Sequence, residues 1–359
     1  MMTRTASLIS IAVVGAGRVA QHYKSILDSG VVSGYRMVGV FDVVAEKSDQ
    51  LASHWNCPAY SSLEEMLVSA KPDLVLVLTP SGLHYEHAKT ALLAGCHVLV
   101  EKPMSLLLNH ASDLNAIADI KKRMLCVAFQ NRFNPAIQAL KRALDASRFG
   151  KILTASVRLR WCRYQSYYED EWHGTWAQDG GVISQQAIHH IDALNWLIGP
   201  VHSVSASMGN LMNELEAEDT LVAAVRFDSG AFGTVEATTA VRPDDFEASL
   251  SVIGENGKAV IGGIALNKVE AWDFVESQPS DEFIAQEASV EVPNGYGLSH
   301  GPLLQEILNR IASGQTEAPV SGADGQATLQ LIHALYKSVE DRRWTSLNDK
   351  PSHSKLGIT

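Results

Sequence analysis

The chain has 359 residues, of which 46% are hydrophobic and 19% are charged, so it is long enough for two globular domains with sizeable cores. Its formal net charge of −11 argues against a nucleic-acid-binding surface, which is normally basic. The four cysteines form no CxxC pair, and no apolar run is long enough for a signal peptide or a membrane span. We therefore expect a cytoplasmic protein with no disulfide framework, no zinc site and no membrane or nucleic-acid partner.

A dinucleotide-binding turn is predicted near the start of the chain. Residues 8–14 are apolar and typical of a strand buried on both faces, and a helix-like stretch begins at Val19. Between them lies a GxGxxA motif whose glycines are Gly15 and Gly17. The first glycine permits a tight turn, the second lets the backbone approach a pyrophosphate, and the helix N-terminus offers its N–H groups to the phosphates.

The second predicted strand, residues 37–41, ends at Asp42, which lies 25 residues after Gly17. This is near the spacing of the carboxylate that binds the adenosine ribose in dinucleotide-binding folds. A carboxylate there repels a 2′-phosphate and favours NAD over NADP. The alternative interpretation is a loop aspartate that caps a helix.

Apolar strands at 73–78, 98–100 and 124–129 alternate with helical stretches at 84–94 and 109–120. This alternation predicts a doubly wound parallel sheet, in which ligands bind at the carboxyl ends of the strands. Polar groups follow these strands at Thr79-Pro80, Glu101-Lys102-Pro103 and Gln130-Asn131-Arg132. Pro103 must end its strand, which leaves Lys102 at the ligand-binding edge, although a surface lysine is the alternative.

The pattern changes after about residue 134. Strands are predicted at 152–161, 201–208, 219–227, 231–239, 247–253 and 258–262, and helices at 135–147, 302–313 and 323–341. The turns at 228–230 and 255–257 have hairpin composition, so the second sheet should be mostly antiparallel. The predicted fold class is α/β: a Rossmann domain over 1–130, followed over 131–359 by an α+β domain with a mostly antiparallel sheet.

An aromatic-rich loop, residues 161–176, interrupts the second domain. Its rings could line a pocket for a sugar or a base, or could cover an edge of the core. A predicted helix at 184–198 follows, on which Gln185 and His189 share one face that continues to Asp192. Since adjacent histidines point about 100° apart on a helix, at most one of His189 and His190 serves a given site, and a structural histidine is the alternative for either. No HExxH or other metal-ligand spacing occurs.

Taken together, these motifs resemble the glucose–fructose oxidoreductase / inositol dehydrogenase (Gfo/Idh/MocA) family. The motifs that carry the resemblance are Gly15-Ala16-Gly17, Thr79-Pro80 with His84, Glu101-Lys102-Pro103, Gln130-Asn131-Arg132, and Gly180-Gly181 followed by His189 and Asp192. The resemblance implies a Rossmann domain, a mostly antiparallel α+β domain whose sheet face mediates oligomerisation, and a homo-oligomer such as a dimer or tetramer.

The same resemblance implies roles for individual residues. Lys102 and His189 are implied as catalytic residues. Contacts to NAD are implied for Gly15, Gly17, Arg18, Val19, Asp42, Thr79, Pro80, His84, Glu101, Lys102, Gln130 and Asn131. Contacts to substrate are implied for Lys102, Arg163, Tyr168, Trp172, Gln185, Gln186, His189 and His300. No metal is implied.

Within the family the sequence is similar to the UDP-N-acetyl-2-amino-2-deoxyglucuronate 3-dehydrogenases. The residues that carry this similarity are Gln130-Asn131-Arg132, Arg163-x-Gln165-x-Tyr167-Tyr168, Trp172-x-Gly174-x-Trp176, Gln186, His189 and Gly297-x-x-His300. Three positions depart from the usual pattern: Tyr164 stands in place of a proline, His173 in place of an arginine, and Gln185 in place of Asp or Asn.

The similarity implies NAD-dependent oxidation of the 3-hydroxyl of a UDP-N-acetylhexosaminuronate, in surface-polysaccharide sugar synthesis. Arg160 and Arg163 support an anionic substrate, because a guanidinium offers a two-pronged donor to carboxylate or phosphate. Alternatively, Arg160 lies on the sheet and pairs with surface acids. The other functions left open are dehydrogenation of a free polyol or simple sugar such as an inositol, and a non-catalytic NAD-bound sensor.

Overall fold

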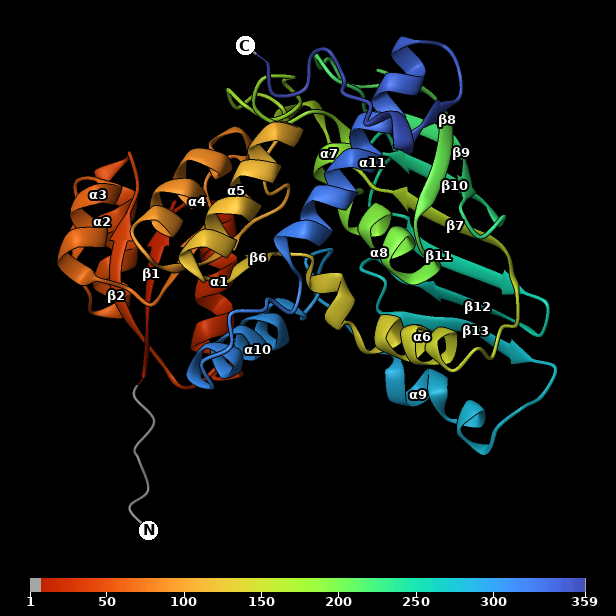
Figure 1. The fold of residues 1–359 in the computed structure, drawn as a ribbon, viewed down its shortest axis with the longest axis horizontal. Helices are drawn as coiled ribbons and strands as arrows, with labels where there is room; N and C mark the ends of the chain where they lie inside the picture. Colours follow the sequence, from red (N-terminus) through yellow and green to blue (C-terminus); the bar gives the residue numbers. More distant parts are fainter. Residues whose placement is uncertain (1–7, 359) are drawn as a thin grey trace. The chain divides into compact units, whose positions relative to one another are not determined.

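A computed structural model describes residues 8–358, which form two compact units (Figure 1). The first unit extends to Ala128 and also includes His300–Gln326, whereas the second comprises Phe129–Ser299 and the chain from Ala327 onward. The sequence places a single domain boundary after residue 130. The first change of unit falls after Ala128, and segment 300–326, which the sequence assigns to the second domain, belongs to the first unit.

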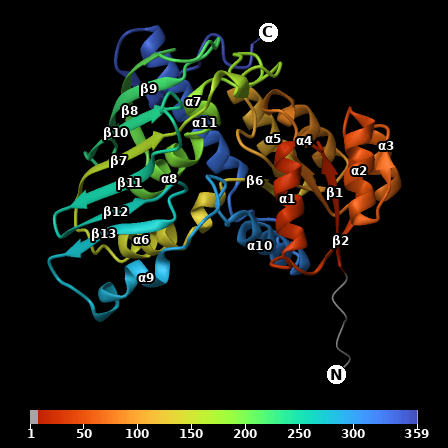
Figure 2. The ribbon, with the colours of Figure 1, turned by 180° about the vertical axis from the view of Figure 1, so that it is seen from behind.

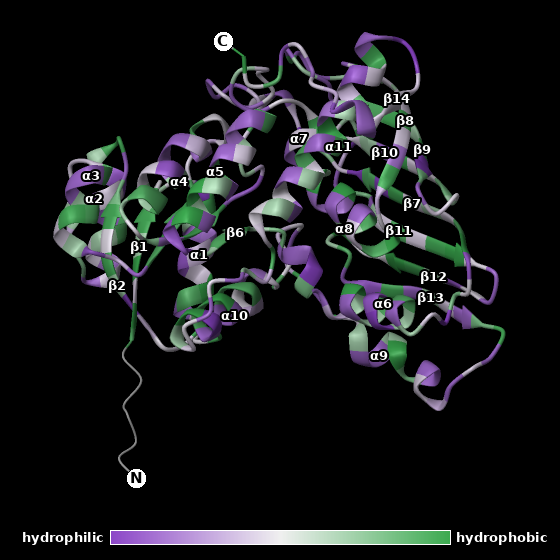
Figure 3. Ribbon diagram, in the orientation of Figure 1, coloured by the Kyte–Doolittle hydropathy of each residue, from purple (hydrophilic) through white to green (hydrophobic). Residues whose placement is uncertain are grey.

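The first unit contains a six-stranded parallel sheet with strand order β3-β2-β1-β4-β5-β6. Its strands are β1 (Ile9–Val14), β2 (Tyr35–Phe41), β3 (Ala59–Tyr60), β4 (Leu74–Val77), β5 (His97–Val100) and β6 (Leu125–Val127). Every residue of β1 and β4 is buried, as expected for strands covered on both faces, and β1 is largely green in Figure 3. The strand order places the turns after β1 and β4 side by side at the carboxyl edge, where the order reverses.

Helices cover both faces of this sheet. They are α1 (Arg18–Asp28), α2 (Ala45–Trp55), α3 (Leu63–Ala70), α4 (His84–Leu93), α5 (Leu108–Lys121) and α10 (His300–Ala312), with a 3₁₀ turn η1 (Ser81–Leu83) before α4. Helix α4 packs against α3 and α5, whereas α10 packs against α1 and β1. The C-terminal part of the chain therefore completes the packing around the first helix of the nucleotide-binding fold, and α1 buries Ala20, Tyr23, Ile26 and Leu27.

The second unit contains an eight-stranded sheet with strand order β13-β12-β11-β7-β10-β9-β8-β14. The strands are β7 (Ile152–Arg160), β8 (Val201–Gly209), β9 (Thr220–Phe227), β10 (Phe232–Thr238), β11 (Glu247–Gly254), β12 (Gly257–Gly262), β13 (Lys268–Phe274) and β14 (Thr345–Ser346). All neighbouring pairs are antiparallel except β7 and β10, which run parallel. The hairpins predicted at 228–230 and 255–257 connect β9 to β10 and β11 to β12.

One face of this sheet is covered by helices and the other is open. The helices of the unit are α6 (Pro135–Asp145), α7 (Val182–Gln185), α8 (Ile188–Ile198), α9 (Ile284–Ala288) and α11 (Gly322–Glu340), whose first turn belongs to the first unit. Short 3₁₀ turns are η2 (Gln130–Phe133), η3 (Gln165–Tyr167), η4 (Pro279–Glu282) and η5 (Leu347–Asp349). Helix α8 contacts β7 and β11, and Figure 2 shows the strands from the side that carries no helix. No helix within residues 8–358 is long and apolar enough to cross a membrane.

The structure differs from the sequence prediction at the helix expected over 184–198. It consists of two helices, α7 and α8, with Gln186 and Ala187 between them. The N–H groups of both Gln186 and Ala187 donate to the carbonyl of Val182, which ends α7, and α8 starts at Ile188. The expected common face of Gln185, His189 and Asp192 is therefore not formed. Gln185 donates a hydrogen bond to Asp179 at 2.7 Å, whereas the carboxylate of Asp192 accepts a hydrogen bond from Arg132.

Candidate active site

The glycine motif forms a turn that fits a dinucleotide. Gly15 has φ +93°, and a Cβ there would lie 2.8 Å from the backbone of Leu78, so the close approach of these two segments requires glycine. By contrast, a Cβ at Gly17 would meet nothing within 4 Å, so the backbone at the start of α1 faces open space. A tight turn followed by an accessible helix N-terminus is the arrangement that binds a pyrophosphate.

Asp42 holds this turn in place. Its carboxylate accepts hydrogen bonds from the N–H of Ala16 at 2.6 Å and from the N–H of Val44 at 2.8 Å, one on each oxygen. Each carboxylate oxygen has a second lone pair, so Asp42 can also accept hydrogen bonds from ribose hydroxyls. The residues present therefore fit NAD. Arg18 and Val19 form the first turn of α1, where the sequence predicted cofactor contacts.

His84 connects two of the predicted strand-end motifs. Its side chain is 1% exposed, and its Nδ1 and Nε2 atoms each lie 2.7 Å from a carbonyl oxygen, of Pro103 and Thr79 respectively. Burial lowers the pKa of His84 to about 4, and the two carbonyl oxygens oppose that shift. His84 is buried between the segments that carry Thr79-Pro80 and Lys102-Pro103, so it positions both at the carboxyl edge of the sheet.

Glu101 and His300 belong to one buried cluster in the first unit. Tyr23 donates a hydrogen bond to Glu101 at 3.0 Å, and the His300 ring lies 3.9 Å from the same carboxylate. His300 is 2% exposed and its Nδ1 atom lies 3.2 Å from Nε2 of His22. The resemblance places His300 among the substrate contacts, and in the structure its ring lies beside His22 and Glu101 of the Rossmann unit.

In the second unit, η2 and α8 are joined by a buried ion pair. Arg132 donates from Nε and from one terminal nitrogen to the two oxygens of Asp192, at 2.8 and 2.7 Å, and Thr328 donates to the same carboxylate at 3.0 Å. In the same 3₁₀ turn Gln130 and Asn131 are 2% and 5% exposed. The Oε1 atom of Gln130 is buried and has no hydrogen-bond partner within residues 8–358, which suits a contact to a bound ligand.

The two adjacent histidines of α8 occupy different environments. His189 is half-buried, and its ring meets the Phe129 ring edge-on at 6.0 Å between centroids. His190 is 2% exposed and packs edge-on against Trp161, and burial lowers its pKa to about 4. His190 is therefore a neutral core residue at neutral pH, which leaves His189 as the histidine able to act on a ligand.

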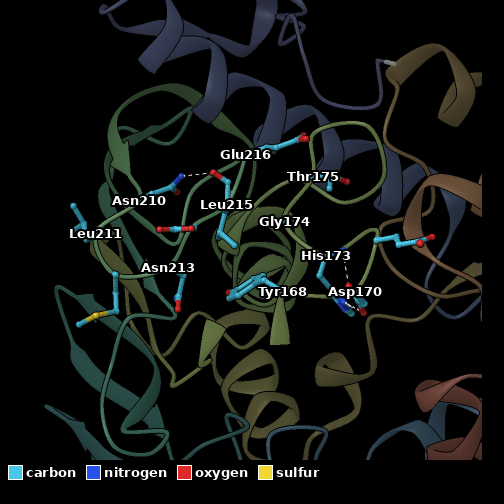
Figure 4. A pocket seen from close by; sticks show the side chains of 13 residues that line it. Tyr168, Asp170, His173, Gly174, Thr175, Asn210, Leu211, Asn213, Leu215 and Glu216 are labelled. Atoms are coloured by element: carbon cyan, nitrogen blue, oxygen red, sulfur yellow. Dashed lines mark hydrogen bonds and ion pairs between the residues drawn. The ribbon is translucent and has the colours of Figure 1, made fainter. Parts of the chain in front are cut away.

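A cavity of about 760 Å³ lies within the second unit, between residues 168–175 and residues 210–216 (Figure 4). Asp219 fixes one wall by accepting three hydrogen bonds of 2.9 Å from the N–H groups of residues 211–213. Tyr168, predicted as a substrate contact, lines the cavity and makes a 2.8 Å hydrogen bond with Thr239. His173 faces the cavity with its Nδ1 atom 2.5 Å from Asp170.

The charge of this cavity is opposite to what Arg160 and Arg163 suggested. Its lining contains four carboxylates and neither Arg nor Lys; the acids are Asp170, Glu171, Glu214 and Glu216. Arg160 lies on the sheet, where it pairs with Glu236 at 2.6 Å and Glu247 at 2.9 Å, as the alternative interpretation proposed. Arg163 pairs with Asp245 at 2.9 Å and lies against the rings of Trp161 and Tyr167.

The remaining predicted substrate residues lie in the same unit. Trp172 is half-buried and its ring packs against that of His173, with 3.7 Å between centroids. Gln186 is 6% exposed in the turn before α8. Sequence reasoning did not identify Glu218 or the pairing of Arg132 with Asp192, because their partners are distant along the chain. It also missed Asp219, whose partners are N–H groups of a nearby loop. Within the described residues, no group of three His, Cys, Asp or Glu side chains is arranged to hold a metal ion.

Comparison with known proteins identifies the family. Residues 9–129 match the oxidoreductase family with an NAD-binding Rossmann fold, and residues 137–260 match the GFO/IDH/MocA C-terminal domain. The chain belongs to the GFO/IDH/MocA family. The predicted family, the α/β fold class with its parallel and mostly antiparallel sheets, and NAD as cofactor are thereby confirmed. This member of the GFO/IDH/MocA family is an NAD-dependent sugar dehydrogenase.

Two crystal structures, both of WlbA dehydrogenases in complex with NADH and UDP-GlcNAcA, are similar over nearly the whole chain. The enzyme from Chromobacterium violaceum has a TM-score of 0.88 and 34% identity and covers 95% of this chain and 96% of its own. The enzyme from Bordetella pertussis has a TM-score of 0.87 and 33% identity, covering 96% and 99%. D-glucoside 3-dehydrogenase of Escherichia coli is 27% identical over 94% of this chain and 97% of its own length. The scyllo-inositol 2-dehydrogenase (NAD⁺) of Bacillus subtilis is 28% identical over 71% and 74%.

Proposed function

We propose that this chain oxidises the 3-hydroxyl of a UDP-linked N-acetylhexosaminuronate to a ketone, as a cytoplasmic step in the synthesis of surface-polysaccharide sugars. The observation that carries the proposal is the similarity to two WlbA dehydrogenases crystallised with NADH and UDP-GlcNAcA, at 34% and 33% identity over 95% or more of this chain. The aromatic loop adds support, because flat rings pack against uracil and sugar faces.

In the proposed mechanism, NAD⁺ supplies the acceptor for the hydride that leaves the sugar. Lys102 and His189 are the candidates for the general base that removes the hydroxyl proton. Lys102 follows β5 at the carboxyl edge of the Rossmann sheet, beside the buried Glu101, and His189 stands near the start of α8. These two residues belong to different units, so their joint action is itself part of the proposal.

We assign the cofactor to the glycine turn, Asp42 and the strand-end residues described above, and the substrate to residues of the second unit. The proposed substrate contacts in that unit are Arg163, Tyr168, Trp172, Gln185, Gln186 and His189. Arg163 is the guanidinium nearest in sequence to the cavity-lining segment, and an anionic substrate must compete with Asp245 for it. Gln185 is held by Asp179, so its role is to shape the site unless that hydrogen bond breaks.

A second candidate function is oxidation of an uncharged sugar or polyol, and the cavity favours it. Carboxylates accept hydrogen bonds from sugar hydroxyls but repel a diphosphate, and the four acids of the cavity lining have no cation among them. The D-glucoside and scyllo-inositol dehydrogenases among the relatives are named for uncharged substrates.

The two functions are separated by comparing turnover of UDP-N-acetylglucosaminuronate with that of UDP-N-acetylglucosamine, a simple glucoside and myo-inositol. The proposal expects the highest kcat/KM with the uronate and a higher KM for the uronate in Arg163→Ala. Equal or better turnover of inositol or the glucoside would replace it with the second function. An unchanged KM in Arg163→Ala would remove Arg163 from the site.

We also propose that the open face of the second sheet joins copies of this chain in a dimer or tetramer. This face exposes the apolar side chains of Val222, Phe232 and Ile253, which are 52%, 62% and 45% exposed. Phe232 and Ile253 lie on either side of Thr154 in the register of β10, β7 and β11, and apolar side chains gathered on an exposed face are typical of interaction surfaces. Light scattering after size exclusion should show an oligomer for the wild type and smaller species for Phe232→Asp. A monomeric wild type would contradict the proposal.

A further inference from the structure

Four polar side chains of the first unit form a chain of contacts that the proposed chemistry does not use. Helix α1 contributes His22 and Tyr23, the end of β5 leads into Glu101, and α10 contributes His300. Tyr23, Glu101 and His300 are 0%, 5% and 2% exposed, whereas His22 is half-buried and reaches the surface. Burying titratable groups is costly, so a row of them that ends at the surface calls for a functional explanation.

His300 lies in the middle of this row and faces a partner with each ring nitrogen. Its Nδ1 atom is 3.2 Å from Nε2 of His22, and its Nε2 atom is 3.9 Å from Oε1 of Glu101. The Tyr23 hydroxyl donates to the same Oε1 at 3.0 Å, and the backbone N–H of Lys102 donates to Oε2 at 3.4 Å. The row therefore runs from Glu101, the residue next to the proposed catalytic lysine in the chain, to the half-buried imidazole of His22.

Burial, together with the charges around it, keeps His300 neutral. Burial lowers its pKa well below the usual value, and the positive charges of Lys102 and of protonated His22 act in the same direction. Burial raises the pKa of Glu101, while Lys102 and Tyr23 lower it. A neutral imidazole carries a proton on one nitrogen and a lone pair on the other, so it can accept a proton on one side and release one on the other.

We propose that Glu101, His300 and His22 conduct the proton of each sugar oxidation from Lys102 to solvent. This rests on the proposed role of Lys102 as the base. Tyr23 holds the Glu101 carboxylate in line but does not move the proton. A plain structural clamp on Glu101 would need only the Tyr23 hydroxyl, whereas the pair of histidines leads onward to the surface.

The proton transfer balances as follows. The sugar hydroxyl gives its proton to the Lys102 amine while the carbinol carbon gives up a hydride to the cofactor. The Lys102 ammonium protonates Glu101, Glu101 protonates Nε2 of His300, and the Nδ1 proton of His300 passes to Nε2 of His22, which releases its other proton to water. Glu101 and His300 are 3.9 Å apart. Polar groups separated by more than 3.5 Å are commonly bridged by a water molecule, and such a water would carry the proton between these two. Tautomer exchange then restores both His300 and His22.

The test measures NADH formation and proton release together in single-turnover stopped flow, with a pH indicator in weak buffer. In the wild type the two signals should coincide. In His300→Gln and His22→Gln, proton release should lag behind NADH formation by roughly 10²-fold, the lower end of the scale for positioned acid–base groups, because an amide forms hydrogen bonds but does not take up a proton. Added imidazole should remove the lag. Coincident signals in both variants would overturn the proposal.

His54→Gln is the matched control, because His54 is an exposed histidine of the same unit, held by Asp28 at 2.9 Å, and it should show no lag. A second measurement needs no NAD: ¹⁵N imidazole spectra of the cofactor-free protein should show the His300 signals shifting in His22→Gln and in Glu101→Gln. Unchanged His300 signals would contradict the chain of contacts.

Lys102→Ala separates the proposed conduction route from the proposed base. Retained turnover in Lys102→Ala would remove the lysine as base and the route with it. Lost turnover in Lys102→Ala, together with coincident signals in His300→Gln, would leave the lysine as base and reject the route. Since His22 is half-buried, His22→Gln remains informative if the buried His300 substitution prevents folding.

Discussion

The guanidinium of Arg132 and the carboxylate of Asp192 form a two-point ion pair inside the second unit, with side chains 7% and 1% exposed. The pair links η2, the 3₁₀ turn just after the Rossmann sheet, to α8, the helix that carries His189. Asp192 lies three residues after His189, so the ion pair fixes the turn of helix from which the candidate catalytic histidine projects.

Removing one partner of this pair should strongly destabilise the protein. Asp192→Leu leaves the Arg132 charge buried without its counter-ion, at an expected cost of about 3–5 kcal/mol in the free energy of unfolding. Urea denaturation checks this. The double variant Arg132→Met/Asp192→Leu should recover most of the loss, because it removes the orphaned charge. Thr328→Val, which removes one neutral donor to the carboxylate, should cost only about 1 kcal/mol. A double variant as unstable as the single one would contradict the interpretation.

Cofactor preference should depend on Asp42. Asp42→Ala removes the acceptor for the N–H groups of Ala16 and Val44, so we expect weaker NAD binding and a smaller preference over NADP. Fluorescence titration with both cofactors measures the two dissociation constants. Asp42→Asn keeps one acceptor oxygen and removes the charge, so it should raise NADP affinity relative to NAD with less damage to the turn. Tighter NADP than NAD binding by the wild type, or an unchanged preference in Asp42→Ala, would contradict the prediction.

Turnover should depend on Lys102 and His189 but not on His190. Lys102→Ala and His189→Ala should each lower kcat by roughly 10²-fold or more, the usual scale of acid–base assistance, with much smaller effects on NAD affinity. His190→Ala should mainly lower stability, because His190 is a neutral core side chain packed on Trp161. Steady-state kinetics and urea denaturation of the three variants separate these effects. Lost turnover in His190→Ala with a nearly unchanged His189→Ala would reverse the assignment.

The parts of the fold that could be predicted are those whose signal is local. The buried strand β1, the glycine turn at Gly15 and the hairpin at 228–230 each follow from residues that are adjacent in sequence. Helices α2 and α3 were not predicted. Helix α2 is mostly polar and buries only Ser48, Leu51 and Ala52, so it carries little apolar periodicity. The break between α7 and α8 could not be predicted either, because apolar residues recur across it at the spacing of one continuous helix.

Long-range packing decided the rest. The placement of α10 in the first unit rests on contacts such as that of Gly301 with Val31, where a Cβ would lie 2.8 Å from the valine side chain, and no local pattern indicates it. Arg160 faces Glu247 in the sheet register, so its guanidinium is engaged on the sheet. The sequence next to an arginine does not show which residues lie beside it on the neighbouring strands. For the same reason His300 could be assigned only by resemblance.

A buried carboxyl group of the second unit leads to a pH prediction. Glu218 is 1% exposed and accepts hydrogen bonds at 3.1 Å from the N–H of Ile183 and from the hydroxyl of Tyr336. Its Oε2 atom has no hydrogen-bond partner in the part of the chain that the structure describes. Burial raises the pKa of Glu218 to about 8, so the group is protonated in the folded protein at neutral pH.

Stability should therefore fall as pH rises toward 8. Between the ordinary glutamate pKa and the folded value of about 8, the folded state holds a proton that the unfolded state has lost, so each pH unit in this window lowers the free energy of unfolding by about 1.4 kcal/mol. The contribution is fully present below the pKa of the unfolded state and is lost once the pH passes the pKa of the folded state.

Urea denaturation at several pH values measures this contribution as the difference in the free energy of unfolding between wild type and Glu218→Gln, which cancels the other titrating groups. Glu218→Gln keeps the side-chain shape and a hydrogen-bond acceptor but cannot ionise, so it should gain stability relative to wild type as pH rises. Parallel curves for the two proteins would show that the Glu218 carboxyl titrates alike in both states.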